Sequence, residues 1–205
     1  MPNMRSTLIA DLLRAGSSKG SFLSFFQKFL LDSGFKAVVL FRLANWLQRR
    51  GWNRIAFLVA ATSLAKTGAD IVPCAKIGPG FVIKHPVGVV IGSGCSIGRN
   101  FTVLQGVTLG EKYSSDGKHE YPIIGDNVTV CAGSMILGKV RVGDNAVIGA
   151  NSVVLRNVPQ NCVVAGMPAR IIRKSTKKIQ PKVLDDLIDS VPVLAKTKSL
   201  QAPNF

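Results

Sequence analysis

A six-residue spacing of aliphatic residues constrains the fold of this chain more than any other feature. Thirteen positions follow it, namely Ile71, Ile77, Ile83, Ile91, Ile97, Val103, Leu109, Ile124, Val130, Ile136, Val142, Ile148 and Val154. An α-helix repeats every 3.6 residues and a strand every two, so neither element produces this pattern. A six-residue repeat is typical of a β-solenoid, in which three short strands form each coil around an aliphatic interior. We therefore predict a mainly β fold, a parallel β-helix.

Glycine follows the aliphatic residue at seven of these positions, which are 78, 92, 98, 110, 125, 143 and 149. We expect this glycine to turn the corner between two strands, because it tolerates backbone angles that other residues avoid. The spacing is interrupted twice. Two extra residues fall within 85–90, and a longer excursion loop is expected over 111–123.

The β-helix is expected to span 70–174, between an N-terminal α-helical region at 1–69 and a C-terminal tail at 175–205. Amphipathic helices are predicted at 21–31, 35–50 and 53–66, and a short one in the tail at 181–190. We expect the N-terminal helices to cover the open end of the first coil, as terminal caps do in solenoids. A basic helical face that lies on a membrane is the alternative.

The chain is strongly basic, with 26 Lys and Arg against 11 Asp and Glu and a net charge of +15. The excess lies in the helical region and the tail, without an aromatic RNA-binding signature or a helix-turn-helix pattern, so no nucleic-acid partner is expected. Four cysteines without a CxxC pair favour a reducing cytoplasm over a disulfide or zinc framework. The sequence shows no signal peptide or bilayer-spanning stretch, which leaves peripheral contact with the inner face of the membrane open.

Several longer motifs resemble the serine acetyltransferase branch of the hexapeptide acyltransferases. They are Asp70-Ile-Val-Pro, the run from Lys76 to His85, Leu104-Gln-Gly-Val-Thr-Leu-Gly110, Gly149-Ala-Asn-Ser-Val-Val-Leu155 and Val164-Ala-Gly-Met-Pro-Ala-Arg170. The resemblance implies that the β-helix is left-handed, that acetyl-CoA is the co-substrate and that no metal takes part. It also implies a homotrimer in which each active site draws on two chains.

By this resemblance, His85 is the catalytic base and Asp70 the carboxylate that orients it. A hydroxyl attacks only when a base near neutral pKa accepts its proton, and a carboxylate fixes the tautomer of the imidazole. The two residues are 15 positions apart, close to one coil of three hexads, so we expect their side chains to stack. His119 lies two residues from the position of the family's second histidine. It is assigned a catalytic role toward the substrate, with an exposed loop residue as the alternative.

The resemblance places acetyl-CoA in a groove between neighbouring subunits. The residues assigned to its binding are Gly110, Ala132, Ala150, Gly166, Arg170 and Lys174. Small residues allow the pantetheine arm to approach the backbone, and basic side chains can meet the nucleotide phosphates. A purely structural role of the two alanines is the alternative.

The acceptor side departs from the family pattern. Lys84 precedes the catalytic histidine where serine acetyltransferases carry an aspartate for the substrate ammonium, Lys19 replaces a second such aspartate, and Lys118 replaces an arginine. A lysine repels an ammonium by about 1–4 kcal/mol, depending on burial. We therefore interpret these lysines as substrate-binding residues for an acidic acceptor. This interpretation favours an O-acetyltransferase of capsular or exopolysaccharide sugars. The alternatives are an L-serine O-acetyltransferase of cysteine biosynthesis and a non-catalytic β-helix scaffold.

Overall fold

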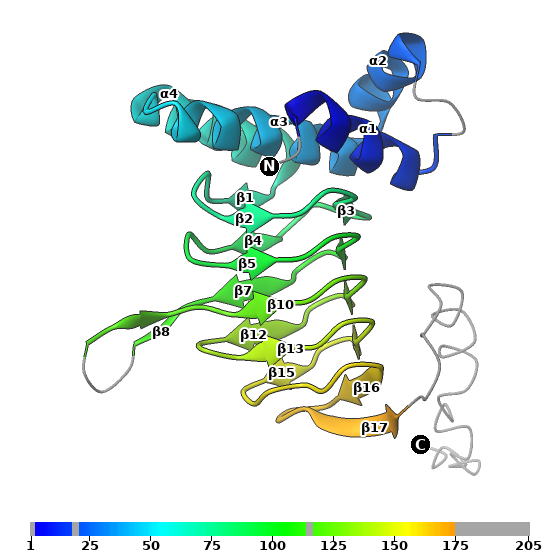
Figure 1. The fold of residues 1–205 in the computed structure, drawn as a ribbon, viewed down its shortest axis with the longest axis vertical. Coiled ribbons are helices and arrows are strands. Elements are labelled where there is room, and N and C mark those ends of the chain that lie inside the picture. The colour runs from blue at the N-terminus through cyan, green and yellow to red at the C-terminus, as the bar shows by residue number, and fades with distance from the viewer. Residues whose placement is uncertain (1–2, 18–20, 114–116, 175–205) are drawn as a thin grey trace, which may run out of the picture.

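The computed structural model describes residues 3–17, 21–113 and 117–174. Helices come first and cover one end of a column of short strands, as Figure 1 shows. They are α1 (Met4–Arg14), α2 (Phe22–Leu31), α3 (Ser33–Arg49) and α4 (Asn53–Thr67). The last three agree with the sequence-based prediction to within two residues at each end, whereas α1 has no counterpart in it. The helix predicted at 181–190 lies outside the described residues.

The N-terminal helices also bear on the expected membrane contact. Within the three described ranges, no helix has the length and apolar character that a membrane crossing requires. Helix α2 exposes Phe22, Leu23 and Leu31 to solvent. Peripheral contact through these helices stays a prediction.

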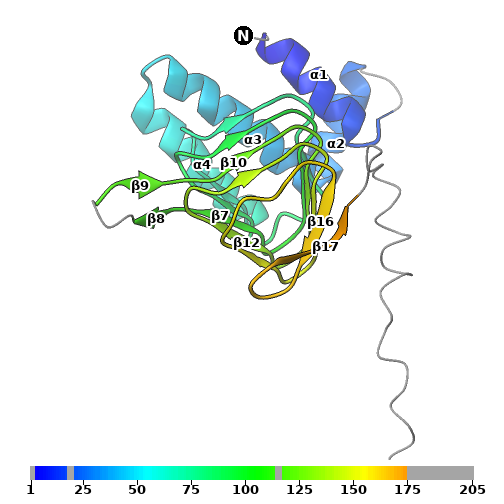
Figure 2. The same ribbon diagram turned by 60° about the horizontal axis from the view of Figure 1, so that its bottom comes forward.

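The strands form three flat faces, and successive strands pass from one face to the next around a prism (Figure 2). The first face contains β1 (Asp70–Ile71), β4 (Val90–Ile91), β7 (Thr108–Gly110), β12 (Met135–Leu137) and β15 (Val153–Val154). The second face contains β2 (Lys76–Ile77), β5 (Ser96–Ile97), β10 (Ile123–Ile124) and β13 (Arg141–Val142). The third face contains β3 (Val82–Ile83), β6 (Thr102–Val103), β11 (Thr129–Val130), β14 (Val147–Ile148) and β16 (Cys162–Ala165). Strand β17 (Arg170–Lys174) pairs antiparallel with β16 and closes the far end.

Strand pairing shows that one regular coil takes three hexads. Val90 pairs with Thr108 at this spacing, and Met135 pairs with Val153. The pairing of Asp70 with Val90 spans a longer coil, because the intervening turn carries two extra residues. The parallel β-helix predicted from the six-residue spacing is confirmed.

A hairpin interrupts the third coil and leaves the prism at the junction of the first and second faces (Figure 1). It consists of β8 (Lys112–Tyr113) and β9 (His119–Glu120), which pair antiparallel. Because the hairpin lies within this coil, the stretch of chain between the paired residues Thr108 and Met135 is much longer than in a regular coil. Regular pairing resumes beyond the hairpin, so the excursion does not disturb the stacking of the coils.

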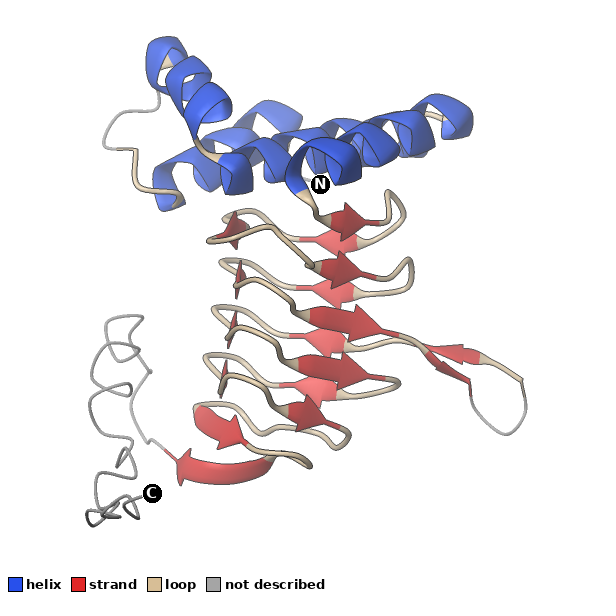
Figure 3. Cartoon of the chain, turned by 180° about the vertical axis from the view of Figure 1, so that it is seen from behind, coloured by secondary structure: helices blue, strands red, loops and turns tan. Residues whose placement is uncertain are grey.

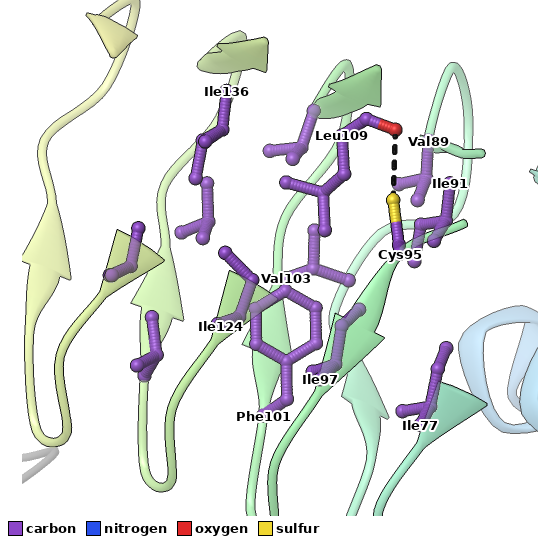
Figure 4. Close-up of a cluster of buried hydrophobic side chains, with 14 of the residues drawn as sticks. Ile77, Val89, Ile91, Cys95, Ile97, Phe101, Val103, Leu109, Ile124 and Ile136 are labelled. Carbon is purple, nitrogen blue, oxygen red and sulfur yellow. Dashed lines mark hydrogen bonds between the residues drawn. The ribbon is translucent and has the colours of Figure 1, made fainter. Parts of the chain in front are cut away.

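Aliphatic side chains fill the prism. All thirteen residues of the six-residue pattern are at most 8% exposed, as predicted. Each strand also buries a second side chain two positions earlier, because alternate residues of a strand point to the same side. Figure 4 shows Val89 with Ile91 and Cys95 with Ile97 in this arrangement.

The role predicted for the glycines after the aliphatic residues is wrong. None of the seven has a positive φ; they are required instead because consecutive coils approach closely. A Cβ at Gly78 would lie 2.6 Å from the carbonyl oxygen of Gly98, and one at Gly98 would lie 2.8 Å from that of Gly125. The left-handed backbone falls two residues later in the turn, as at Asn100, where φ is 57°.

Asparagines at this left-handed position form a hydrogen-bonded ladder between the second and third faces. The side-chain amide of Asn100 donates to Asn127 at 3.0 Å, Asn127 donates to Asn145 at 3.2 Å, and Asn145 donates to Asn161 at 3.0 Å. Asparagine suits the position because it tolerates the left-handed region better than most residues. The ladder fixes the stacking of successive turns along this edge.

Helices α1 and α3 are attached to the first coil by a buried ion pair. The Asp11 carboxylate is fully buried and accepts hydrogen bonds from the backbone N–H groups of Gly80 and Phe81 at 2.8 Å and from Arg42 Nε at 2.9 Å. Arg42 also donates to two backbone carbonyl oxygens of the first coil. The Phe41 ring meets Phe81 edge-on, with centroids 6.2 Å apart. The predicted covering of the open end by the N-terminal helices is confirmed (Figure 3).

All four cysteines are free. Cys74 is exposed, Cys131 is half-buried, and Cys95 and Cys162 are buried. Burial raises the pKa of the Cys95 thiol to about 12 and raises that of Cys131 as well. A reducing compartment such as the cytoplasm stays a prediction.

Candidate active site

The edge between the third and first faces, here called the 3–1 edge, carries five of the twelve predicted site residues. It comprises the turns 84–89, 104–107, 131–134 and 149–152. Lys84 and His85 lie in its first turn, Ala132 lies two coils further and Ala150 three coils further. Gly166 follows β16 at the same edge. Residues that are far apart in the sequence therefore line one edge of the prism.

Asp70 begins β1 directly beside the first turn of the 3–1 edge. Its N–H donates to the carbonyl oxygen of Val89 at 2.8 Å, and the N–H of Gly88 donates to the carbonyl oxygen of Gly68 at 2.9 Å. The Asp70 and His85 side chains are both exposed, and across the described residues no hydrogen bond joins them. Asp70 pairs with Val90 of β4, whereas His85 lies in the turn that precedes β4, so the two residues are not in register. The stacking of acid on base stays a prediction.

A hollow of about 240 Å³ lies between α2, α3 and β3, and Lys84 lines it. Its other charged lining residues are Lys28 and Asp32. Asp32 caps α3 by accepting the N–H of Phe35 at 2.9 Å, and it pairs with Lys28 at 3.1 Å. The hollow beside the His85 turn therefore presents charges of both signs.

Small residues occupy the predicted cofactor positions of the 3–1 edge. Ala132 is half-buried, while Ala150 and Gly166 are exposed, so little side-chain bulk covers the backbone there. Arg170 and Lys174 lie exposed on β17 at the far end of the prism. Arg170 pairs with Ala165 and so lies near the 3–1 edge, whereas Lys174 pairs with Cys162 at the opposite end of β16. Small residues along the edge suit the pantetheine arm of CoA, and the Arg170 cation at its end suits the nucleotide phosphates.

Three further predicted residues lie at the edge between the first and second faces, the 1–2 edge, or on the hairpin that leaves it. Gly110 ends β7, where a Cβ would meet Leu137 of the next coil at 2.9 Å. Lys118 and His119 are exposed on the hairpin. Lys19 lies outside the described residues. Gly110 was predicted to bind acetyl-CoA together with Ala132 and Ala150, but it lies at a different edge of the prism from these two alanines.

A carboxylate that the sequence analysis missed lies beside His119. Glu111 Oε2 is 2.7 Å from His119 Nδ1 and 2.5 Å from the hydroxyl of Tyr121, and Ser93 Oγ donates to this hydroxyl at 3.1 Å. The hydrogen bonds from Tyr121 and His119 hold the pKa of Glu111 below its usual range, and the contact with Glu111 raises the pKa of Tyr121. The sequence feature that could have indicated this contact is the presence of a glutamate before the histidine and a tyrosine after it in the excursion loop.

Comparison with known families agrees with this architecture. Residues 121–156 match the bacterial transferase hexapeptide (six repeats) family, and residues 88–112 match the hexapeptide repeat of succinyl-transferase. The fold and the repeat thus define a hexapeptide-repeat transferase, and the predicted left-handed β-helix is confirmed.

Individual relatives show which family of hexapeptide-repeat transferases the chain resembles. The serine acetyltransferase of Bacillus subtilis is 41% identical over 179 residues, which cover 87% of this chain and 81% of that protein. The structure of Neisseria gonorrhoeae serine acetyltransferase in complex with serine gives a TM-score of 0.72 at 32% identity, covering 82% of this chain and 68% of that one. A serine acetyltransferase complex with CoA gives a TM-score of 0.72 at 32% identity, covering 82% and 69%. The chain belongs to the serine acetyltransferase family.

These relatives correct the substrate prediction. The expected O-acetyltransferase of capsular or exopolysaccharide sugars is wrong, because the matching proteins are serine acetyltransferases. The prediction gave too much weight to Lys84 and Lys118, which are exposed and whose charges water therefore screens. The predicted enzyme class, an acetyl-CoA-dependent O-acetyltransferase, is confirmed.

Proposed function

We propose that this chain transfers the acetyl group of acetyl-CoA to the hydroxyl of L-serine, with His85 as the catalytic base. The carrying observation is that His85 lies exposed on the same edge as Ala132, Ala150 and Gly166, in a chain of the serine acetyltransferase family. This arrangement supports a base at one end of a CoA groove. Relatives solved with CoA and with serine support the choice of both substrates.

In the proposed reaction, His85 accepts the proton of the serine hydroxyl while its oxygen attacks the thioester carbonyl. A C–O bond forms, the C–S bond breaks, and the sulfur leaves as the thiol of CoA after taking up a proton. No covalent enzyme intermediate is needed, because the thioester is already activated. Asp70, which begins the adjacent strand, orients the imidazole and favours its protonated form.

The proposed site lies between copies of the chain in a homotrimer. His85 lies at the 3–1 edge and His119 at the 1–2 edge, on a hairpin that extends away from its own prism (Figure 2). The two imidazoles of one chain therefore face different surroundings. Three prisms packed side by side can bring the hairpin of one chain to the 3–1 edge of the next, so that each site draws on two chains.

L-serine is expected to release CoA thiol from acetyl-CoA in the presence of this protein, at a rate proportional to enzyme concentration. The measurement is a thiol assay, with O-acetylserine identified by mass spectrometry. L-alanine serves as the control because it has the same ammonium and carboxylate without the hydroxyl. Thiol release that is equal with both amino acids, or absent with L-serine, would contradict the proposal.

Lys84→Asp is expected to raise kcat/KM for L-serine about fivefold. The substitution replaces an exposed cation one residue from His85 by a carboxylate that attracts the ammonium of the substrate, an effect of about 1 kcal/mol in solvent. Lys76→Asp makes the same charge change on the exposed side of β2 and is the matched control. An equal or lower kcat/KM in Lys84→Asp would show that Lys84 does not face the ammonium.

A further inference from the structure

Glu111 joins the hairpin to the body of the prism. Its Oε2 atom is shared by the His119 ring and the Tyr121 hydroxyl. Residue 111 directly follows β7, whereas His119 lies on the returning strand β9, so the carboxylate bridges the two sides of the hairpin base. The rings of Tyr113 and His119 also contact each other, with centroids 4.7 Å apart. His119 is therefore held on two sides.

Tyr121 connects the Glu111 carboxylate to the second coil of the β-helix. Its ring lies so closely against the turn 92–94 of the second coil that a Cβ at Gly94 would overlap the ring, and one at Gly92 would be 3.0 Å from it. Ser93, between these glycines, donates to the Tyr121 hydroxyl. The position of Glu111 is thus set by the β-helix rather than by the tip of the hairpin.

The contact with Glu111 determines which imidazole nitrogen carries the proton. An ionised carboxylate only accepts hydrogen bonds, and its two donors favour the ionised form of Glu111. The 2.7 Å contact therefore requires the proton of neutral His119 on Nδ1. Nε2 then carries a lone pair, and it makes no hydrogen bond within the described ranges. The ring offers an acceptor to an N–H or O–H group.

We propose that Glu111 is a positioning residue of the acetyltransferase site, which holds His119 as the Nδ1–H tautomer so that Nε2 accepts a hydrogen bond from the ammonium or hydroxyl of the acceptor. The inference rests on the proposed function for the identity of the acceptor. It also gives the site a group that accepts from an ammonium, where Lys84 and Lys19 replace the aspartates expected from the family. Tyr121 and Ser93 act through Glu111.

The tautomer can be read directly by nitrogen-15 NMR of the imidazoles in the full-length protein. The chain has two histidines, so His119→Gln assigns both sets of signals. In its neutral form, wild-type His119 is expected to show a protonated Nδ1 and an unprotonated Nε2. Glu111→Ala is expected to move the proton largely to Nε2, the form that a free histidine side chain favours in water. The tautomer of His85 should not change.

Glu120→Ala is the matched control. It removes a carboxylate from the same hairpin, where Glu120 is 3.9 Å from Lys139, and among the described residues no side-chain hydrogen bond or ion pair joins Glu120 to His119. The His119 tautomer is expected to stay as in the wild type. An Nε2–H tautomer in the wild type, or a tautomer that does not change in Glu111→Ala, would overturn the positioning role.

Kinetics test the link to the acceptor. In Glu111→Ala, KM for L-serine is expected to rise on the order of tenfold, the loss of one charge-assisted hydrogen bond, while KM for acetyl-CoA stays within about twofold. An unchanged KM for L-serine would show that His119 does not contact the acceptor. Failure of the wild type to use L-serine would contradict the proposed function alone, because the tautomer spectrum does not depend on turnover.

Discussion

His85→Ala is expected to reduce the turnover of acetyl-CoA and L-serine by about 10²- to 10⁴-fold, the usual contribution of a general base. The alanine cannot accept the hydroxyl proton, so the oxygen attacks the thioester as a poor nucleophile. The His85 side chain is exposed and buries no core surface, so the melting temperature should change little. Thiol release over time and a thermal unfolding scan measure the two effects.

The control for His85→Ala is its KM for acetyl-CoA, measured separately from its turnover with L-serine. KM for acetyl-CoA should stay near the wild-type value, because the groove residues Ala132, Ala150 and Gly166 are untouched. Turnover within tenfold of the wild type would remove His85 from its catalytic role. In that case the Glu111-oriented imidazole of His119 would be the remaining candidate base.

Asp11→Ala is expected to lower the free energy of unfolding by about 3–5 kcal/mol, the range for breaking a buried ion pair. The loss leaves Arg42 charged and buried without its carboxylate, and it leaves the N–H groups of Gly80 and Phe81 without their acceptor. Urea unfolding followed by circular dichroism measures the change at constant protein concentration, since oligomerisation contributes to apparent stability.

Asp32→Ala is the matched control for this prediction. Asp32 also accepts one backbone N–H and pairs with one cation, but its side chain is 34% exposed, whereas Asp11 is fully buried. Its loss should cost about 1 kcal/mol, as for a helix cap with a solvent-exposed ion pair. Equal effects of the two substitutions would show that burial of the Asp11–Arg42 pair contributes little to stability.

The sequence specified the β-helix because its repeat reports directly on burial. Every aliphatic position of the six-residue pattern points into the prism, and both interruptions of the pattern correspond to real departures from the regular coil of three hexads. Helix α1 escaped prediction because its buried residues are Thr7, Asp11 and Leu12. Because most of the buried residues of α1 are polar, the sequence lacks the apolar stripe from which an amphipathic helix is predicted.

The candidate site was predictable only where it depends on the coil repeat. Counting turns places His85, Ala132 and Ala150 on one edge. The partnership of Glu111 with His119 depends on how the hairpin folds back, which has no periodic signal. The substrate inference failed for a different reason. A charge read from sequence, such as that of Lys84, says nothing about its exposure or about a nearby carboxylate such as Asp32.

Because of the hairpin, the side chains that it presents can change with little change in the stability of the β-helix. Strand pairing is regular on both sides of it, so an exchange or an added residue in this arm leaves the hydrogen bonds of the supporting coils in place. Lengthening such an arm costs little, roughly 0.6 kcal/mol for each doubling of its length. Evolution can therefore vary the chemistry that the arm presents while the scaffold beneath it stays constant.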